Sequence, residues 1–283
     1  MNYIIISLII LIILILLYLL NTSNKTENYQ NYENKNSESI ENNEYNINPP
    51  TKVMEHPNYG LIKCFDSSDT VCNVILNGDI WEEELFEKNF KPNIKENTTI
   101  LDCGAFIGSH TLLIKKLNRN NDIFAFEMMP EQYKILQDNI KLNNYDNIFT
   151  FNFALGDKID RIKLPNINYN ASETNHGGTE LGKTTDILNV DMIQIPLDFI
   201  LPLIKKPVSF IKIDVEAYEI NVMNGSKELI TKYKPIIQIE ISTLYDNYNN
   251  FINSDIWKYM ETLGYKIKNL DVSPYLHDYL LYY

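Results

Sequence analysis

From residue 98 onward, short apolar segments with the pattern of buried strands alternate with segments of helical periodicity. Strands that alternate with helices are joined by crossover connections, which place the strands parallel in one sheet and the helices on both of its faces. The sequence therefore predicts an α/β fold. Strands are expected at residues 98–103, 122–127, 147–154, 207–213 and 235–241, and strand-like runs follow at 264–270 and 278–283.

Helices are expected between these strands. The segment 109–117 carries leucines on one face, and Pro130 suits the first turn of the next helix. Tyr133, Leu136 and Ile140 give that second helix its apolar stripe. Further helices are expected up to Gly225 and near 252–263, whereas a long polar stretch at 165–190 interrupts the alternation.

The first fifty residues differ from the rest of the chain. Residues 4–20 are almost entirely Ile and Leu without a charge, so they are long enough to span a thin bilayer as a single-pass N-terminal transmembrane anchor, residues 1–20. A cleaved signal peptide is the alternative, although the segment lacks a basic start and an Ala-x-Ala-like site. Few positive charges flank it, which leaves its orientation in the membrane open. Residues 21–50 are polar and poor in aliphatic side chains, which predicts a disordered stalk before one folded domain at 51–283.

The charge balance excludes one class of partner. The chain has 25 Lys and Arg against 37 Asp and Glu, for a net charge of −12. Binding to a phosphate backbone needs clusters of basic side chains, so nucleic-acid binding is not expected. The three cysteines show neither a metal-ligand spacing nor a disulfide framework.

The loop at residues 102–108 joins the first strand to a helix. Gly104 and Gly108 let the backbone pass close to a ligand, and the helix N-terminus offers free N–H groups. Glu127 ends the second strand, where an acid can bind both hydroxyls of a ribose. Asp102 would repel a pyrophosphate and attract a cationic amino-acid moiety, which favours S-adenosylmethionine over NAD. A tight turn without any ligand is the alternative.

A second group of acids follows the strand at 207–213. Asp214 and Glu216 point the same way if the strand continues through them, and they lie at the carboxyl end, where ligands bind in open α/β sheets. Glu219 is either part of this group or a first-turn acid that the helix dipole favours. Mg²⁺ takes carboxylate ligands, but no third ligand is evident, and no metal site is predicted.

Four segments carry a resemblance to a known family. They are ILDCGAFIG at 100–108, FNFALGD at 151–157, FIKIDVEAYE at 210–219 and KPIIQIE at 234–240. In these motifs and in their order the chain resembles the FkbM family of S-adenosylmethionine-dependent methyltransferases over roughly residues 75–283. Ala217 stands where the family usually has Gly.

The resemblance implies a class I methyltransferase domain at 51–283, which is Rossmann-like and has a seven-stranded sheet whose last strand is antiparallel. It also implies S-adenosyl-L-methionine as the cofactor. The cofactor contacts that it implies are Asp102, Gly104 and Gly108 at the methionine part, Glu127 at the ribose, and Ala154, Leu155 and Asp157 near the adenine.

Family members mostly methylate hydroxyl oxygens, so the resemblance implies O-methylation of a glycan or small molecule. An alcohol needs a base to take its proton. The candidates are Asp214, Glu216 and His176, which precedes two glycines in a loop that could close over a substrate; a solvated loop histidine is the alternative. Other functions left open are a protein or amine methyltransferase and a catalytically silent, membrane-anchored binding protein.

Overall fold

The computed structural model describes residues 49–66, 69–167, 169, 176–178, 187–242, 247–270 and 276–283. The predicted anchor, nearly all of the predicted stalk and most of the 165–190 stretch lie outside these residues. Within the described part of the chain, no helix combines the length and the apolar character that a membrane crossing requires. Anchor and stalk therefore stay predictions from the sequence.

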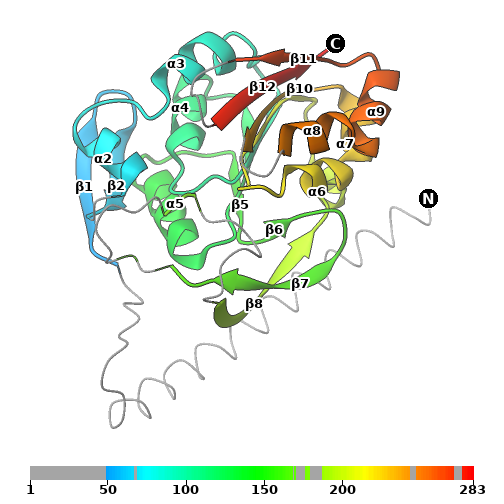
Figure 1. Ribbon diagram of the computed structural model, residues 1–283. Coiled ribbons are helices and arrows are strands. Elements are labelled where there is room, and N and C mark those ends of the chain that lie inside the picture. The colour runs from blue at the N-terminus through cyan, green and yellow to red at the C-terminus, as the bar shows by residue number, and fades with distance from the viewer. Residues whose placement is uncertain are drawn as a thin grey trace.

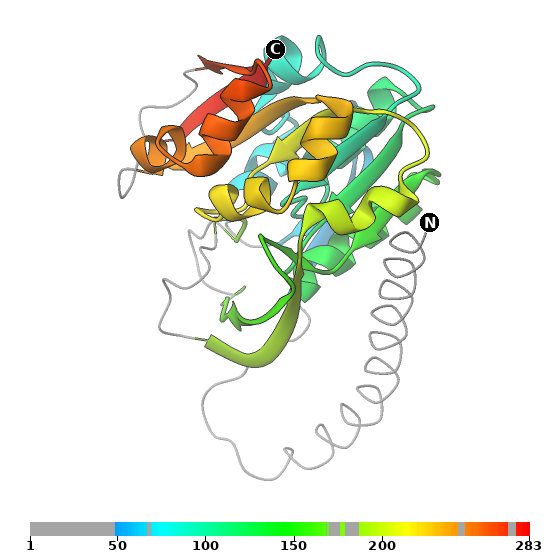
Figure 2. The same cartoon turned by 90° about the vertical axis from the view of Figure 1, so that its right-hand side faces the viewer.

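The central sheet has seven strands in the order β11-β12-β10-β9-β3-β4-β5, with helices on both sides (Figures 1 and 2). The five strands from β10 to β5 run parallel, whereas the last strand, β12, is antiparallel to both of its neighbours, β10 and β11. This confirms the predicted class I fold. The strands are β3 (Thr99–Cys103), β4 (Asp122–Phe126), β5 (Ile148–Phe151), β9 (Val208–Ile213), β10 (Ile236–Ser242), β11 (Lys266–Asn269) and β12 (Leu276–Tyr282).

Two apolar cores cover the two faces of the sheet, because successive side chains of a strand point to opposite faces. On β3, Ile100 packs into one core and Leu101 into the other. The first core includes α2 (Thr70–Leu76), the π-helical segment Phe86–Phe90, α4 (Ser109–Leu117) and part of α5 (Pro130–Leu142). The second includes the 3₁₀ segment Leu197–Leu203, α6 (Glu219–Asn224), α7 (Lys227–Tyr233) and α9 (Asp255–Thr262).

The expected strand at 147–154 is wrong at its end. β5 stops at Phe151, and β6 (Ala154–Leu155) leaves the central sheet to pair with β8 (Ile187–Ile195), which pairs with β7 (Asp160–Pro165). Asn152 explains the break. Its side-chain amide donates to the carbonyls of Glu127 and Met128, at 2.8 and 2.9 Å, and so turns the chain away from the ladder.

A hairpin and a divided helix also differ from the expectation. The N-terminal part of the domain forms a hairpin of β1 (Thr51–His56) and β2 (Gly60–Phe65). The amide of Asn139 on α5 exchanges hydrogen bonds with the backbone of Lys63 and donates to the Ile107 carbonyl at 2.8 Å, which ties this hairpin to the loop before α4.

The helix expected near 252–263 is two helices, α8 (Asn247–Ile252) and α9, since the Ser254 hydroxyl caps the second one.

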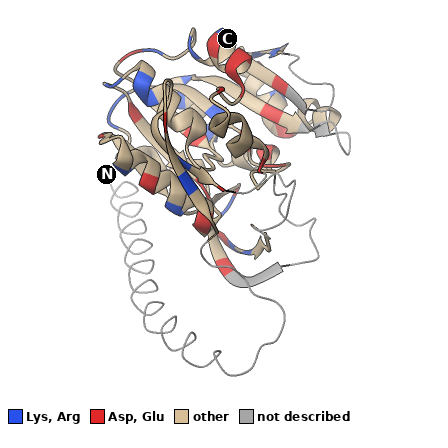
Figure 3. Cartoon of the chain, turned by 90° about the vertical axis from the view of Figure 1, so that its left-hand side faces the viewer, with Lys and Arg blue, Asp and Glu red and all other residues tan. Residues whose placement is uncertain are grey.

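The charged side chains are mixed along the described elements. Figure 3 shows Lys and Arg scattered among Asp and Glu in this view, without a basic stripe.

Candidate active site

A cleft opens at the carboxyl ends of β3, β4 and β9. Its empty volume, including space that is open to solvent, is about 520 Å³. The predicted site residues that line it are Gly104, Glu127, Ala154, Leu155, Asp214 and Glu216. The structure thus brings predicted cofactor residues and predicted catalytic residues to one cleft.

The loop after β3 closes tightly on the end of β9. Gly104 has φ +81°, and a Cβ atom on it would lie 1.7 Å from the carbonyl oxygen of Asp214. Only glycine fits here, because both the backbone angle and the close approach exclude a side chain. The N–H groups of Gly104 and Ala105 donate to the Phe126 carbonyl at 3.0 and 2.8 Å, which ties the loop to β4 as well.

Glu127 lies at the end of β4 and is 6% exposed. Its two carboxylate oxygens accept hydrogen bonds from the N–H groups of Phe106 at 2.8 Å and Met129 at 2.7 Å. Burial raises the pKa of Glu127 to about 7, although these two hydrogen bonds oppose the shift. Each carboxylate oxygen has a second acceptor position, so the group can also accept hydrogen bonds from a ligand hydroxyl.

Three predicted cofactor residues do not line the cleft. Asp102 is fully buried, accepts a hydrogen bond from the Thr111 hydroxyl, and has its pKa raised by burial. Gly108 has φ +90° just before α4, where a Cβ would press on Leu136. Asp157 is exposed. Asp102 and Gly108 therefore support the loop from the side that faces away from the cleft. Direct contact of these three residues with a cofactor stays a prediction.

His176 is buried rather than solvated. Its backbone N–H donates to the Asp69 carboxylate at 2.8 Å, and its ring contacts the rings of Phe65 and Tyr169, with centroids 5.2 and 4.9 Å away. Burial lowers the pKa of His176. The ring does not line the cleft, whereas the next residue, Gly177, does. The catalytic role of His176 stays a prediction, and the structure adds an anchoring role for this part of the loop.

The turn after β9 differs from the expected strand continuation. β9 ends at Ile213, and both Glu216 and Ala217 have positive φ, +53° and +69°. At Ala217 a glycine would relieve strain, which gives a physical reason for the glycine usual in the family. Glu219, in the first turn of α6, accepts a hydrogen bond from the Ala217 N–H at 2.9 Å. Its carboxylate therefore holds this turn.

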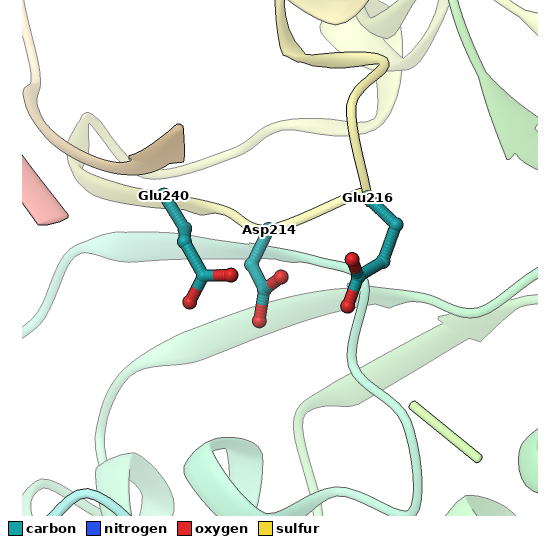
Figure 4. Close-up of side chains that lie close together, drawn as sticks. All are labelled: Asp214, Glu216 and Glu240. Atoms are coloured by element: carbon teal, nitrogen blue, oxygen red, sulfur yellow. The ribbon is translucent and has the colours of Figure 1, made fainter. Parts of the chain in front are cut away.

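Asp214 and Glu216 still point to the same side, and a third acid, Glu240, joins them (Figure 4). One carboxylate oxygen from each of the three lies within 4.8 Å of the others. Burial and the neighbouring carboxylates, Asp214 first among them, raise the pKa of Glu240 to about 11. Oxygen ligands of this kind suit a divalent cation.

Glu240 was not singled out from the sequence. A usable signal was present, because Gln238 and Glu240 alternate with buried isoleucines in β10. A polar alternation of this kind places both side chains on one face of the strand, and Glu240 lies near its carboxyl end.

Comparisons with known proteins identify the family. A family model described as the methyltransferase FkbM domain matches residues 102–267. The chain belongs to the FkbM methyltransferase family. The matched region begins at Asp102 and extends into β11, so it contains the whole candidate site. The family that the sequence motifs indicated is therefore confirmed.

Several proteins are similar to this FkbM domain. "Methyltransferase 1" of Beauveria bassiana is 27% identical over 148 residues, which make up 46% of this chain and 59% of the fungal protein. The crystal structure of an FkbM methyltransferase from Methylobacillus flagellatus has 18% identity and a TM-score of 0.48, and the match covers 67% of this chain and 44% of that one. The structure of M. jannaschii TYW2 in complex with AdoMet has 12% identity and a TM-score of 0.40, with 86% and 87% covered.

Proposed function

We propose that this chain transfers a methyl group from S-adenosylmethionine to a hydroxyl oxygen of a glycan or small molecule. The observation that carries the proposal is the charge of the cleft. Its described lining contains the carboxylates of Glu127, Asp214 and Glu216 but no lysine or arginine. Such a lining attracts the sulfonium and ammonium groups of S-adenosylmethionine, whereas it repels the diphosphate of a dinucleotide.

The residues present fit this cofactor. Glu127 has acceptor positions left for ribose hydroxyls, as an acid at the end of the second strand has in nucleotide-binding α/β folds. Ala154 and Leu155 supply an apolar wall for the adenine, and both are buried. Gly104 contributes only backbone atoms to the lining of the cleft.

When bound, S-adenosylmethionine supplies an electrophilic methyl group. The chain has to align the acceptor oxygen with it and to remove one proton. Asp214 or Glu216 takes this proton from the acceptor hydroxyl, since both carboxylates line the cleft. His176 is the third candidate, with a ring that burial keeps neutral near pH 7.

An amine acceptor on a protein or small molecule is the second candidate. The same observation favours it, because carboxylates that attract a sulfonium also attract a protonated amine. A transferred methyl group on nitrogen rather than oxygen would identify this alternative.

We also propose that residues 1–20 anchor the methyltransferase domain to a membrane as a single-pass helix. The support is the uncharged Ile- and Leu-rich run at 4–20. Fractionation of the full chain tests it: an anchored protein stays with the membranes after a carbonate wash, and release by that wash would contradict the anchor.

The function is tested in two steps on the full chain. Calorimetry with S-adenosylmethionine and with NAD comes first, and we expect binding of the former alone. Tritiated-methyl transfer to extracted glycans, small hydroxylated compounds and proteins follows, with the labelled atom identified by mass spectrometry. Asp214→Asn and Glu216→Gln should each bind the cofactor within about tenfold of the wild type, and the variant of the true base should transfer methyl roughly 10²–10⁴-fold more slowly. Cofactor binding without transfer to any acceptor would favour a silent binding protein.

A further inference from the structure

A buried lysine lies directly behind the cleft. Lys212 is on β9 and is 3% exposed. Its ammonium donates to the Asp214 carboxylate at 2.8 Å and to the Gly104 carbonyl at 3.2 Å, and it lies 3.9 Å from a carboxylate oxygen of Asp102. A buried ammonium is costly unless it is paired and hydrogen-bonded, and each of these contacts is to an oxygen.

The sheet register explains why acids surround this lysine. Lys212 pairs with Asp102 on β3 and with Gln238 on β10. At the edge of the sheet where β9 and β10 end, Glu240 pairs with Asp278 of β12, and Asp214 follows the last residue of β9. Lys212 therefore lies beneath a row of carboxylates that runs across the sheet.

The charge of Lys212 depends on these neighbours. Burial alone would lower the pKa of Lys212. The carboxylates of Asp214 and Asp102 have a larger effect than burial, so the pKa of Lys212 is raised. The side chain is thus a fixed positive charge. It connects two pieces of chain that both line the cleft, the loop after β3 and the turn after β9.

We propose that Lys212 is a positioning residue of the methyl-transfer site. It holds the Asp214 carboxylate and the Gly104 carbonyl in place, and its ammonium sets the charge that a cofactor meets in the cleft. The inference rests on S-adenosylmethionine being the cofactor. Nothing in this role requires Lys212 to touch the cofactor, because its ammonium acts through the two groups that it holds and through the interior, where charges are screened weakly.

Two ligands that differ in charge test this role. S-adenosylmethionine carries a sulfonium cation, whereas S-adenosylhomocysteine has a neutral sulfur in its place. In the full chain, Lys212→Met should lower the affinity for S-adenosylhomocysteine by roughly ten- to a hundredfold, because the two cleft groups lose a charged hydrogen-bond donor. The affinity for S-adenosylmethionine should fall less, since a repelling cation is also removed. The affinity ratio of the two ligands should therefore rise about threefold or more in favour of S-adenosylmethionine.

Two further variants complete the experiment. Lys212→Arg keeps the positive charge and should keep the wild-type ratio of affinities. Lys115→Met is the matched control, because Lys115 is also a fully buried lysine, with an ammonium that donates to two backbone carbonyls at the far end of α4. It should leave both affinities within about twofold of the wild type, whatever it does to the melting temperature.

The possible outcomes separate the inference from the proposed function. Wild-type protein that binds neither ligand overturns both. Wild-type protein that binds both, together with a folded Lys212→Met that keeps the affinities or loses them in equal proportion, overturns the role of Lys212 alone. Equal losses are the result expected of a lysine that only supports the fold, because a general loosening does not distinguish a sulfonium from a neutral sulfur.

Discussion

Replacing Glu240 by glutamine should stabilise this protein at neutral pH. The Glu240 carboxyl is held against Asp214 and Asp278, and burial together with these neighbours raises its pKa from 4.5 to about 11. An acid with a raised folded-state pKa favours folding below its unfolded pKa and loses that advantage as the pH rises. Glutamine keeps the shape of the protonated acid at every pH. Above about pH 4.5 the folded wild type loses stability, because its Glu240 stays protonated while the unfolded chain releases the proton; the variant does not have this loss.

The size of this cost follows from the two pKa values. At pH 7 the unfolded chain has released the proton that the folded chain keeps, over 7 − 4.5 = 2.5 pH units. At about 1.4 kcal/mol per unit this amounts to about 3 kcal/mol. This is an upper limit, because Glu82 and Asp278, with pKa values raised to about 8 and about 6, share the same crowding. We expect a gain of about 1–3 kcal/mol, or roughly 3–10 °C in melting temperature for a domain of this size.

Thermal unfolding followed by circular dichroism at about pH 4, 5.5 and 7 measures the gain. Glu240→Gln should match the wild type at the lowest pH and exceed it increasingly above. Glu261→Gln, on an exposed position of α9, is the control and should shift the melting temperature little at any pH. A variant that is no more stable than the wild type at neutral pH would refute the conclusion that burial and the neighbouring carboxylates make Glu240 destabilising. It would mean that a bound cation or a hydrogen bond compensates the Glu240 carboxylate.

Four other changes have expected outcomes. Gly104→Ala should lower the free energy of unfolding by roughly 2–4 kcal/mol more than Gly264→Ala, because both glycines have positive φ but only the former meets a backbone oxygen; urea unfolding gives the difference. Glu127→Ala should weaken S-adenosylmethionine binding by roughly ten- to a hundredfold, which calorimetry measures, and an unchanged affinity would contradict the ribose assignment. His176→Ala should slow tritiated-methyl transfer more than it weakens cofactor binding, and wild-type rates would leave His176 with its anchoring role alone. Deleting residues 1–50 should leave a folded domain that binds S-adenosylmethionine, and circular dichroism with calorimetry would expose a failure to fold or bind.

The central part of the fold could be predicted because both faces of its strands are buried. β3, β4, β9 and β10 consist largely of fully buried residues, so each stands out as a short apolar run and lies within about one residue of its expected bounds. The β1–β2 hairpin has no such signal. β1 has only one buried residue in six, His56, which leaves no apolar alternation to detect.

The cofactor half of the site could be predicted because it is local in sequence. The loop at 102–108 and Glu127 follow consecutive strands, and the pairing of β3 with β4 brings them together in any parallel α/β sheet. The break at Asn152 could not be predicted in this way. It depends on where the ends of β4 and β5 come to lie, so that one side-chain amide reaches two carbonyls.

The acidic half of the site depends on the strand order instead. Asp214 and Glu240 are close because β10 is the parallel neighbour of β9, and both acids lie near carboxyl ends. Asp278 comes to the same edge for the opposite reason. β12 is antiparallel, so the edge at which β9 and β10 end is the edge at which β12 begins, and Asp278 is an early residue of that strand that pairs with Glu240. The parallel pairing of β9 with β10 and the reversed insertion of β12 thus make neighbours of three acids that are 26 and 38 residues apart in sequence. Lys212, two residues before Asp214, donates a hydrogen bond to the Asp214 carboxylate of this group.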